Sequence, residues 1–261
     1  MYRHHEESIQ NAIEYFQKET DVEALLLGGS WAHGFATPVS DIDVMVIVSD
    51  RNYAERLSQG RIQFSNRELC TYADGYVDSK YLGESYLQQV AEKGSEPARF
   101  AFQDARVLIS RTEGLDERLR MITRYPVEGK AERARRFYAQ FEAWNWYVNE
   151  ALKLPDRYLL GLSVSKLVLF GGRLILTHNE VLYPYHKWFL RALAGTKEKP
   201  PALLESIETL YQETSAENVR RFYELVKGYR DWGVPETGWP AQFMLDSELN
   251  WLTGAAPVDD L

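Results

Sequence analysis

Two aspartates stand two residues apart in the segment GGSWAHGFATPVSDIDVMVIV. They are Asp41 and Asp43, and the apolar run 42–48 that contains the second of them reads as a buried strand. Side chains alternate along a strand, so both carboxylates point to the same side of the sheet. Charges beside a buried strand are costly unless a cation compensates them, and Mg²⁺ prefers carboxylate oxygens as protein ligands. The spacing therefore predicts a metal site at Asp41 and Asp43.

A glycine turn precedes these carboxylates by about ten residues. Gly28 and Gly29 end the apolar run 22–27, and glycine lets the backbone turn tightly and approach a ligand without a side-chain clash. Ser30 then offers a hydroxyl, and its amide opens a short helix whose free N–H groups suit phosphate oxygens. We therefore expect Gly29 and Ser30 to contact a phosphate-bearing ligand.

A third carboxylate, Asp78, lies in the segment YVDSKYL. We expect this segment to form a strand next to 42–48. If the strand register aligns Asp78 with Asp41 and Asp43, the three carboxylates surround one metal, and Asp78 is also placed to deprotonate an acceptor hydroxyl. Each signal is weak alone, because an Asp-x-Asp pair commonly lies in a solvated turn and binds no metal. The combination of the strand, the Gly-Gly-Ser turn, the Asp-x-Asp pair and the third carboxylate is specific.

The elements that position these residues are mixed in the first part of the chain. Helical spacing predicts helices near 5–19 and 85–94. Apolar runs predict strands at 22–27, 42–48 and 105–110, and the dipeptide Asp74-Gly75 predicts a tight hairpin between strands at 68–74 and 75–82. This pattern predicts an α/β type of domain with a mixed sheet over residues 1–125.

After residue 125 the pattern is helical throughout. Apolar residues recur at helical spacing, with proline and glycine at the breaks, in the segments 132–153, 158–178, 187–195, 201–213 and 217–233. We therefore predict an α+β fold: a catalytic domain at 1–125 followed by an all-α helical bundle at 126–261.

The composition of the chain restricts the classes of partner that we expect it to bind. The net charge of −8 disfavours a protein that coats nucleic acid and suits small, especially cationic, substrates. The single cysteine, Cys70, allows no intramolecular disulfide. The first twenty residues are polar, and no uncharged stretch approaches the length of a membrane span. These features predict a cytoplasmic protein that binds no membrane, and histidines 4 and 5 read as a mobile terminus.

The segment 22–82 resembles the nucleotidyltransferase superfamily that includes DNA polymerase β and the antibiotic nucleotidyltransferases. Its hydrophobic strand, Gly-Gly-Ser turn and Asp-Ile-Asp motif carry this likeness. The resemblance implies that Ser30 binds the β,γ-phosphates of a nucleoside triphosphate. It also implies that Asp41 and Asp43 bind Mg²⁺ and that Asp78 completes the carboxylate triad.

The helical half is similar to the C-terminal domains of aminoglycoside and lincosamide nucleotidyltransferases, through the segment NEVLYPYHKW at 179–188. In that setting Lys187 reaches the triphosphate, although a lysine beside a tryptophan is also typical of surface charge over a buried ring. Trp144 and Tyr147 fit either an acceptor pocket or a core. The acidic residues of this half fit either a site for a cationic drug or a solvated helix face; they are Glu142, Glu150 and Glu180.

The resulting functional prediction is a Mg²⁺-dependent nucleotidyltransferase of the EC 2.7.7 class. It transfers a nucleoside monophosphate, AMP from ATP in the simplest case, to a hydroxyl of a small molecule such as an aminoglycoside-like antibiotic. The alternatives are nucleotidylation of a protein or RNA, as in toxin–antitoxin pairs, and a non-catalytic nucleotide-binding module. The sequence leaves the acceptor, the preferred nucleotide and a homodimeric assembly open.

Overall fold

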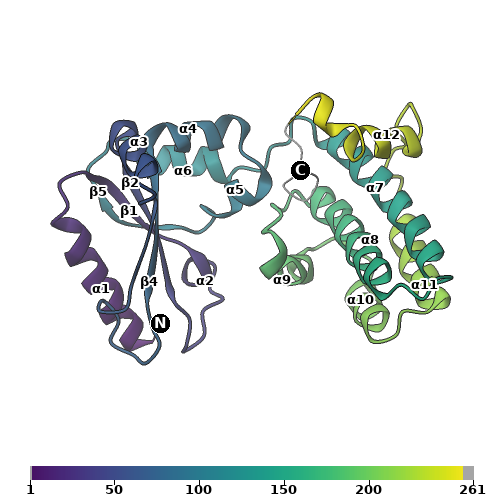
Figure 1. Cartoon of the computed structure of the whole chain (residues 1–261), viewed down its shortest axis with the longest axis horizontal. Coiled ribbons are helices and arrows are strands. Elements are labelled where there is room, and N and C mark those ends of the chain that lie inside the picture. Colours follow the sequence, from purple (N-terminus) through teal and green to yellow (C-terminus); the bar gives the residue numbers. More distant parts are fainter. Residues whose placement is uncertain (1, 255–261) are drawn as a thin grey trace. The chain divides into compact units, whose positions relative to one another are not determined.

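The structure, a computed structural model, describes residues 2–254 of the chain. It divides into two compact units, residues 1–124 and 125–261, whose elements are shown in Figure 1. The first unit contains a β-sheet with helices and the described part of the second is helical, which confirms the α+β fold class. The end of the predicted helical domain, residues 255–261, lies outside the described residues.

A mixed five-stranded sheet forms the centre of the first unit. Its strands are β1 (Val22–Leu27), β2 (Ile42–Val48), β3 (Gln63–Asn66), β4 (Val77–Gly83) and β5 (Arg106–Ser110). Their spatial order is β3-β4-β2-β1-β5. Strand β2 runs antiparallel to β1 and parallel to β4, while β5 and β3 pair antiparallel with β1 and β4. The predicted mixed sheet is therefore confirmed.

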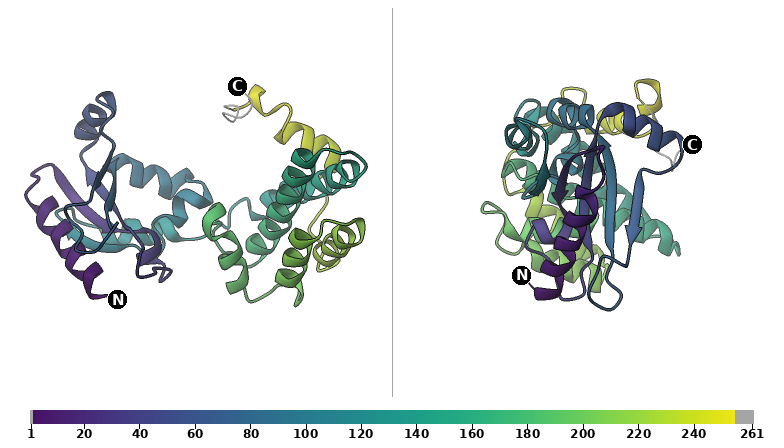
Figure 2. Two further views of the ribbon diagram at one scale, coloured as in Figure 1. Left: turned by 60° about the horizontal axis from the view of Figure 1, so that its bottom comes forward. Right: turned by 90° about the vertical axis from the view of Figure 1, so that its left-hand side faces the viewer.

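Helices cover both faces of this sheet, which explains why β2 is apolar at nearly every position. On one face, α1 (Arg3–Gln17) packs against alternate β2 residues such as Val44 and Val46. On the other face, α4 (Glu84–Lys93) and α6 (Leu115–Thr123) pack against Met45 and Ile47. Figure 2 shows α1 lying along the strands. The short helices that complete the unit are α2 (Gly29–Ala32), α3 (Asp50–Ser58) and α5 (Glu96–Phe100).

The predicted hairpin around Asp74-Gly75 is wrong. Strand β4 pairs antiparallel with residues 63–66, and residues 68–74 form a loop of turns and bends. The prediction failed because the true partner, QFSN, is a polar edge strand with half its residues exposed, whereas the loop carries the apolar side chains typical of a strand. These side chains pack against α1, since Leu69 and Cys70 contact the core on that side of the sheet.

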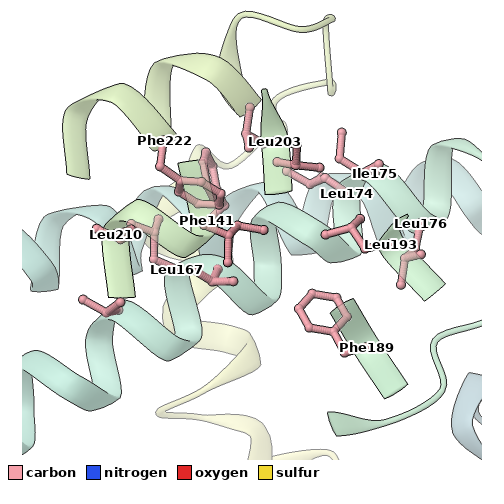
Figure 3. Close-up of a cluster of buried hydrophobic side chains, with 14 of the residues drawn as sticks. Phe141, Leu167, Leu174, Ile175, Leu176, Phe189, Leu193, Leu203, Leu210 and Phe222 are labelled. Carbon is pink, nitrogen blue, oxygen red and sulfur yellow. The ribbon is translucent and has the colours of Figure 1, made fainter. Parts of the chain in front are cut away.

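The second unit is built from helices around one apolar core. They are α7 (Lys130–Ala151), α8 (Arg157–His178), η1 (His186–Trp188), α9 (Phe189–Gly195), α10 (Leu203–Gln212), α11 (Ala216–Lys227), α12 (Trp239–Asp246) and η2 (Asn250–Leu252). In Figure 3, Phe141 of α7, Leu167 of α8 and Phe222 of α11 meet in this core. The packing of α7 against α8 and α11 gives the unit its own hydrophobic centre.

One described helix, α8, is long and apolar enough to cross a membrane by length and composition, with a mean hydropathy of 1.7 over its most apolar window. Half of that window is buried inside the unit. Its residues Val164, Leu167 and Leu174 belong to the core, which is the position of a central helix in a folded helical domain.

Candidate active site

The three carboxylates predicted to act together lie at one end of the β2–β4 pair. In the parallel ladder Asp43 lies opposite Asp78, and Asp41 precedes β2 by one residue. Asp43 shares its strand face with Met45, which packs toward α4 and α6. The register thus places Asp43 and Asp78 side by side on that face, and all three carboxylates are half-buried.

A tyrosine that the sequence reasoning missed connects this cluster. The hydrogen bond from the Tyr76 hydroxyl to Asp41 is the largest cause that raises the pKa of Tyr76 above its ordinary value, and the charges of Asp78 and Asp43 act in the same direction. The charges of all three carboxylates therefore act on the Tyr76 phenol. The signal was available in the sequence, because Tyr76 stands two residues before Asp78 and shares its face of the strand.

A second missed contact holds Asp78. The Gln63 amide on the neighbouring strand β3 donates a hydrogen bond of 3.2 Å to Asp78 Oδ1. Opposite residues in this antiparallel pair are Ser65 and Asp78, so Gln63 reaches its partner diagonally along the same face. This bond fixes one oxygen of Asp78.

The glycine turn lies against Asp43. Gly29 adopts a left-handed φ of +58°, and a Cβ atom placed on it would lie 2.5 Å from Asp43 Cγ and 2.7 Å from Asp43 Cβ. The Gly28 amide donates a 2.9 Å hydrogen bond to the Asp43 carbonyl. Glycine at position 29 is therefore required both by the backbone conformation and by the approach of the carboxylate.

Ser30 follows in the first turn of α2. It is 6% exposed, and its hydroxyl has no hydrogen-bond partner among residues 2–254. A buried polar group without a partner costs about 1–3 kcal/mol. A phosphate oxygen would satisfy this hydroxyl, which agrees with the expectation that Ser30 contacts a phosphate-bearing ligand.

The residues at this site fit a hard divalent cation by their chemistry. Asp41, Asp43 and Asp78 offer the carboxylate oxygens that Mg²⁺ prefers. The charges of all three raise the pKa of the Tyr76 phenol. Within the described part of the chain, no group of three or more His, Cys, Asp or Glu side chains is drawn together in a metal-binding arrangement. The register brings the three carboxylates to one end of the β2–β4 pair without closing them around a single point.

The backbone beside Asp41 is held by two side chains. His5 Nε2 and the Tyr72 hydroxyl lie 2.9 and 2.6 Å from the Ser40 carbonyl oxygen, and both must donate because a carbonyl only accepts. His5 is fully buried, with its ring centroid 4.4 Å from that of Trp31, and burial lowers the pKa of His5 below its ordinary value. The interpretation of His5 as part of a mobile terminus is therefore wrong.

His33 is a packing residue of the first unit. Its side chain is 2% exposed, its Nδ1 lies 3.5 Å from Asp104 Oδ2, and its ring stacks on Phe100 with centroids 4.3 Å apart. Burial is the main cause that lowers the pKa of His33.

Lys187 lies in the second unit, in the 3-10 helix η1. The residue is exposed, and its ammonium lies 5.3 Å from the centroid of the Trp188 ring. Its expected contact with the triphosphate stays a prediction.

Three acidic residues of the second unit are each paired with a lysine of the same unit: Glu142, Glu150 and Glu180. Glu142 is buried and lies 3.1 Å from Lys227, and the two exposed pairs are Lys153–Glu150 and Lys130–Glu180. Glu142 also accepts a 2.7 Å hydrogen bond from the Tyr223 hydroxyl. Within the helical unit these carboxylates are engaged by lysines, which weakens the interpretation of them as a site for a cationic drug.

Comparison with known proteins agrees with this geometry for the first unit. Residues 10–82 match the family described as polymerase beta, nucleotidyltransferase. The matched segment runs from α1 to β4 and contains Gly29, Ser30 and the three carboxylates.

Among solved structures, the chain is similar to a nucleotidyltransferase-like protein from Exiguobacterium sibiricum, with a TM-score of 0.46 and 11% sequence identity over 92% of this chain and 75% of the other. No curated protein matches the sequence. The family match confirms the resemblance drawn from the strand, glycine turn and Asp-Ile-Asp motif, and it covers the segment that builds the candidate site. Within the first unit, residues 10–82 thus belong to the nucleotidyltransferase superfamily that includes polymerase β.

Proposed function

We propose that this protein is a Mg²⁺-dependent nucleotidyltransferase that moves a nucleoside monophosphate, with AMP from ATP as the first candidate, to a hydroxyl of a small molecule. The observation that carries the proposal is the register of β2 and β4, which sets Asp43 beside Asp78 next to the glycine turn and its buried serine. Membership of the superfamily supports transfer of a nucleotidyl group.

In this proposal Asp41, Asp43 and Asp78 hold Mg²⁺, which when bound neutralises charge on the triphosphate. Ser30 donates its hydroxyl to a phosphate oxygen, and Gly29 leaves room for the carboxylate of Asp43. Catalysis rests mainly on positioning and on charge neutralisation.

Asp78 has the second role of accepting a proton from the acceptor hydroxyl. One of its oxygens accepts from Gln63, so the other oxygen is the one that faces the substrate. The hydrogen bond also fixes the orientation of the carboxylate, which general-base catalysis requires.

The acceptor class is a small hydroxylated molecule, with aminoglycoside-like antibiotics as the first compounds to test. The large helical unit supports a small-molecule acceptor over the minimal protein- or RNA-modifying enzymes of toxin–antitoxin pairs. A cytoplasmic location, where ATP and Mg²⁺ are plentiful, belongs to the same proposal.

The test uses the full chain with each labelled nucleoside triphosphate, Mg²⁺, and a panel of aminoglycosides, lincosamides, tRNA and proteins from a lysate. We expect pyrophosphate release that requires a small-molecule acceptor and disappears in Asp41→Asn and Asp43→Asn. The matched control is Asp74→Asn, because Asp74 is an exposed carboxylate 3.9 Å from Arg67 in the loop before β4. That variant keeps full activity if the two site carboxylates act specifically.

Other outcomes reject parts of the proposal. Label on RNA or on a protein shows a macromolecular acceptor. Nucleotide binding without pyrophosphate release on any acceptor favours a non-catalytic module. Turnover that survives Asp43→Asn rejects the assignment of the site itself.

A further inference from the structure

The helical unit contains a large cavity that nucleotidyl transfer at the three carboxylates does not explain. Its volume is about 1090 Å³, and all of its lining residues come from α7, α8, α12 and the segment that follows α12. Small-molecule sites in proteins commonly have volumes of about 300–1,000 Å³, so the space is sufficient for a whole ligand.

One wall of the cavity is aromatic and is fixed in place by hydrogen bonds. Trp144 Nε1 donates a 3.1 Å bond to Gln140 Oε1, and the same buried amide donates a 2.9 Å bond to Ser247 Oγ. Tyr147 and Phe243 continue the wall, with ring centroids 5.1 and 6.3 Å from that of Trp144. A wall of this kind offers ring faces at defined angles without first ordering its own side chains.

The three basic side chains that line the cavity differ in their partners. Arg136 and Asp246 neutralise each other at 2.7 Å and join α7 to α12, and Arg133 donates to the backbone carbonyls of Glu128 and Pro126. Lys166 of α8 is half-buried, its ammonium lies 6.0 Å from the centroid of the Trp144 ring, and it forms no ion pair with any carboxylate of residues 2–254.

The remaining charged residue of the lining is Glu248, which is exposed. The lining therefore holds three basic and two acidic side chains, and Lys166 is a basic group that lies over the Trp144 ring of the aromatic wall. An anion beside this wall would gain a charge-assisted hydrogen bond from the ammonium, whereas a cation would be repelled.

We infer that this cavity is a binding site for a flat aromatic molecule that carries an anionic group. The ring stacks on Trp144 and its aromatic neighbours, and the anionic group binds Lys166. The site lies wholly in the helical unit, so the inference does not depend on the proposed transfer reaction.

The test uses two probes of similar size and different charge. Anilinonaphthalene sulfonate has an aromatic system with one negative charge, and phenylnaphthylamine is its uncharged counterpart. Binding of each to the full chain is measured by fluorescence titration, with stoichiometry checked by calorimetry. We expect one sulfonate per chain.

The variant Lys166→Gln removes the charge and keeps most of the side-chain length, and Lys166→Arg restores the charge. We expect Lys166→Gln to weaken the sulfonate about 2- to 5-fold, as for a partly exposed charge pair, to leave the neutral probe unchanged, and to be rescued by Lys166→Arg. Lys153→Gln is the matched control, because Lys153 follows α7 by two residues, pairs with Glu150 and is not among the residues that line the cavity.

Trp144→Ala should weaken both probes, since both stack on the ring. The inference is overturned if the sulfonate does not bind, if it binds at several equivalent sites, or if Lys166→Gln and Lys153→Gln have equal effects. Equal weakening of the charged and the neutral probe by Lys166→Gln also overturns it, because that result indicates a structural role for the lysine.

Discussion

Replacing Gly29 by alanine introduces backbone strain and also a clash with the Asp43 side chain. Comparison with the same replacement at Gly34 separates these two effects. Gly29 and Gly34 both have left-handed φ angles, +58° and +68°. A Cβ atom on Gly34 meets nothing within 4 Å, whereas one on Gly29 overlaps the Asp43 side chain. Gly34→Ala is therefore the matched control, since it carries the backbone strain alone.

The sizes of the two effects follow from the geometry. A left-handed conformation costs an L-residue with a side chain about 1–2 kcal/mol, so both variants should lose about that much stability. In Gly29→Ala, Asp43 Cγ must also retreat from 2.5 Å to an ordinary contact distance, a movement of about 1 Å. A misplacement of that size in a catalytic group lowers the rate about 100-fold.

The assay measures turnover with the acceptor found in the substrate panel, together with the unfolding transition of each variant. We expect Gly34→Ala to retain turnover within about 2-fold of the wild type, because its strain lies away from the carboxylates. We expect Gly29→Ala to lose about 100-fold at a similar stability.

Equal turnover in the two alanine variants would refute this reasoning, because the displacement of Asp43 would then have no catalytic consequence. A Gly29→Ala protein that fails to fold is distinguished by its circular dichroism spectrum, and the turnover of both alanine variants is then compared at a lower temperature.

Three further predictions concern the first unit. Asp78→Asn should lower turnover at least about 100-fold and leave the unfolding transition unchanged, because the asparagine oxygen still accepts from the neighbouring amide; an unaffected rate contradicts the assignment. Burial lowers the pKa of both His5 and His33, so the unfolded chain binds more protons in acid and stability falls as the pH drops below about 6.5. His5→Gln should reduce this loss between about pH 7 and pH 5 in urea titrations, and an unchanged slope contradicts the burial argument. Arg99 donates to four backbone carbonyls of α4, α6 and the turn between α4 and α5, so Arg99→Met should destabilise the unit by about 2–4 kcal/mol in denaturant titrations. Arg120→Met is the control, because Arg120 is exposed on α6 and its replacement should cost little; equal losses would count against this role.

The sequence predicted those parts of the site that depend on local pattern. The run of apolar residues in β2 identified a strand buried on both faces, and alternation then placed Asp41 and Asp43 on one face. The glycines before Ser30 identified the turn. These inferences need only the periodicity of a strand and the chemistry of glycine.

Contacts between distant segments could not be predicted in the same way. His5 and Tyr72 meet at the Ser40 carbonyl although all three are far apart in the sequence, and their residue types are equally typical of a terminus or a loop. The edge strand at 63–66 was missed because its polar alternation is set by the neighbouring strand rather than by its own residues. Tyr76 differs from these contacts, because strand alternation alone places it on the same face as Asp78.

The parallel pairing of β2 with β4 has a consequence for how the protein acquires its activity during folding. Parallel strands need a long crossover, and here the chain passes through α3 and the edge strand β3 before β4 returns beside β2. Pairings between residues so distant in sequence are slow to form, because loop closure must precede any stabilising contact. Asp43 and Asp78 become neighbours only with this step, so a partly folded chain lacks part of the proposed Mg²⁺ site. The rate at which nucleotide affinity returns during refolding would therefore report the rate at which β2 pairs with β4. Bound nucleotide would stabilise the unit through this pair of strands.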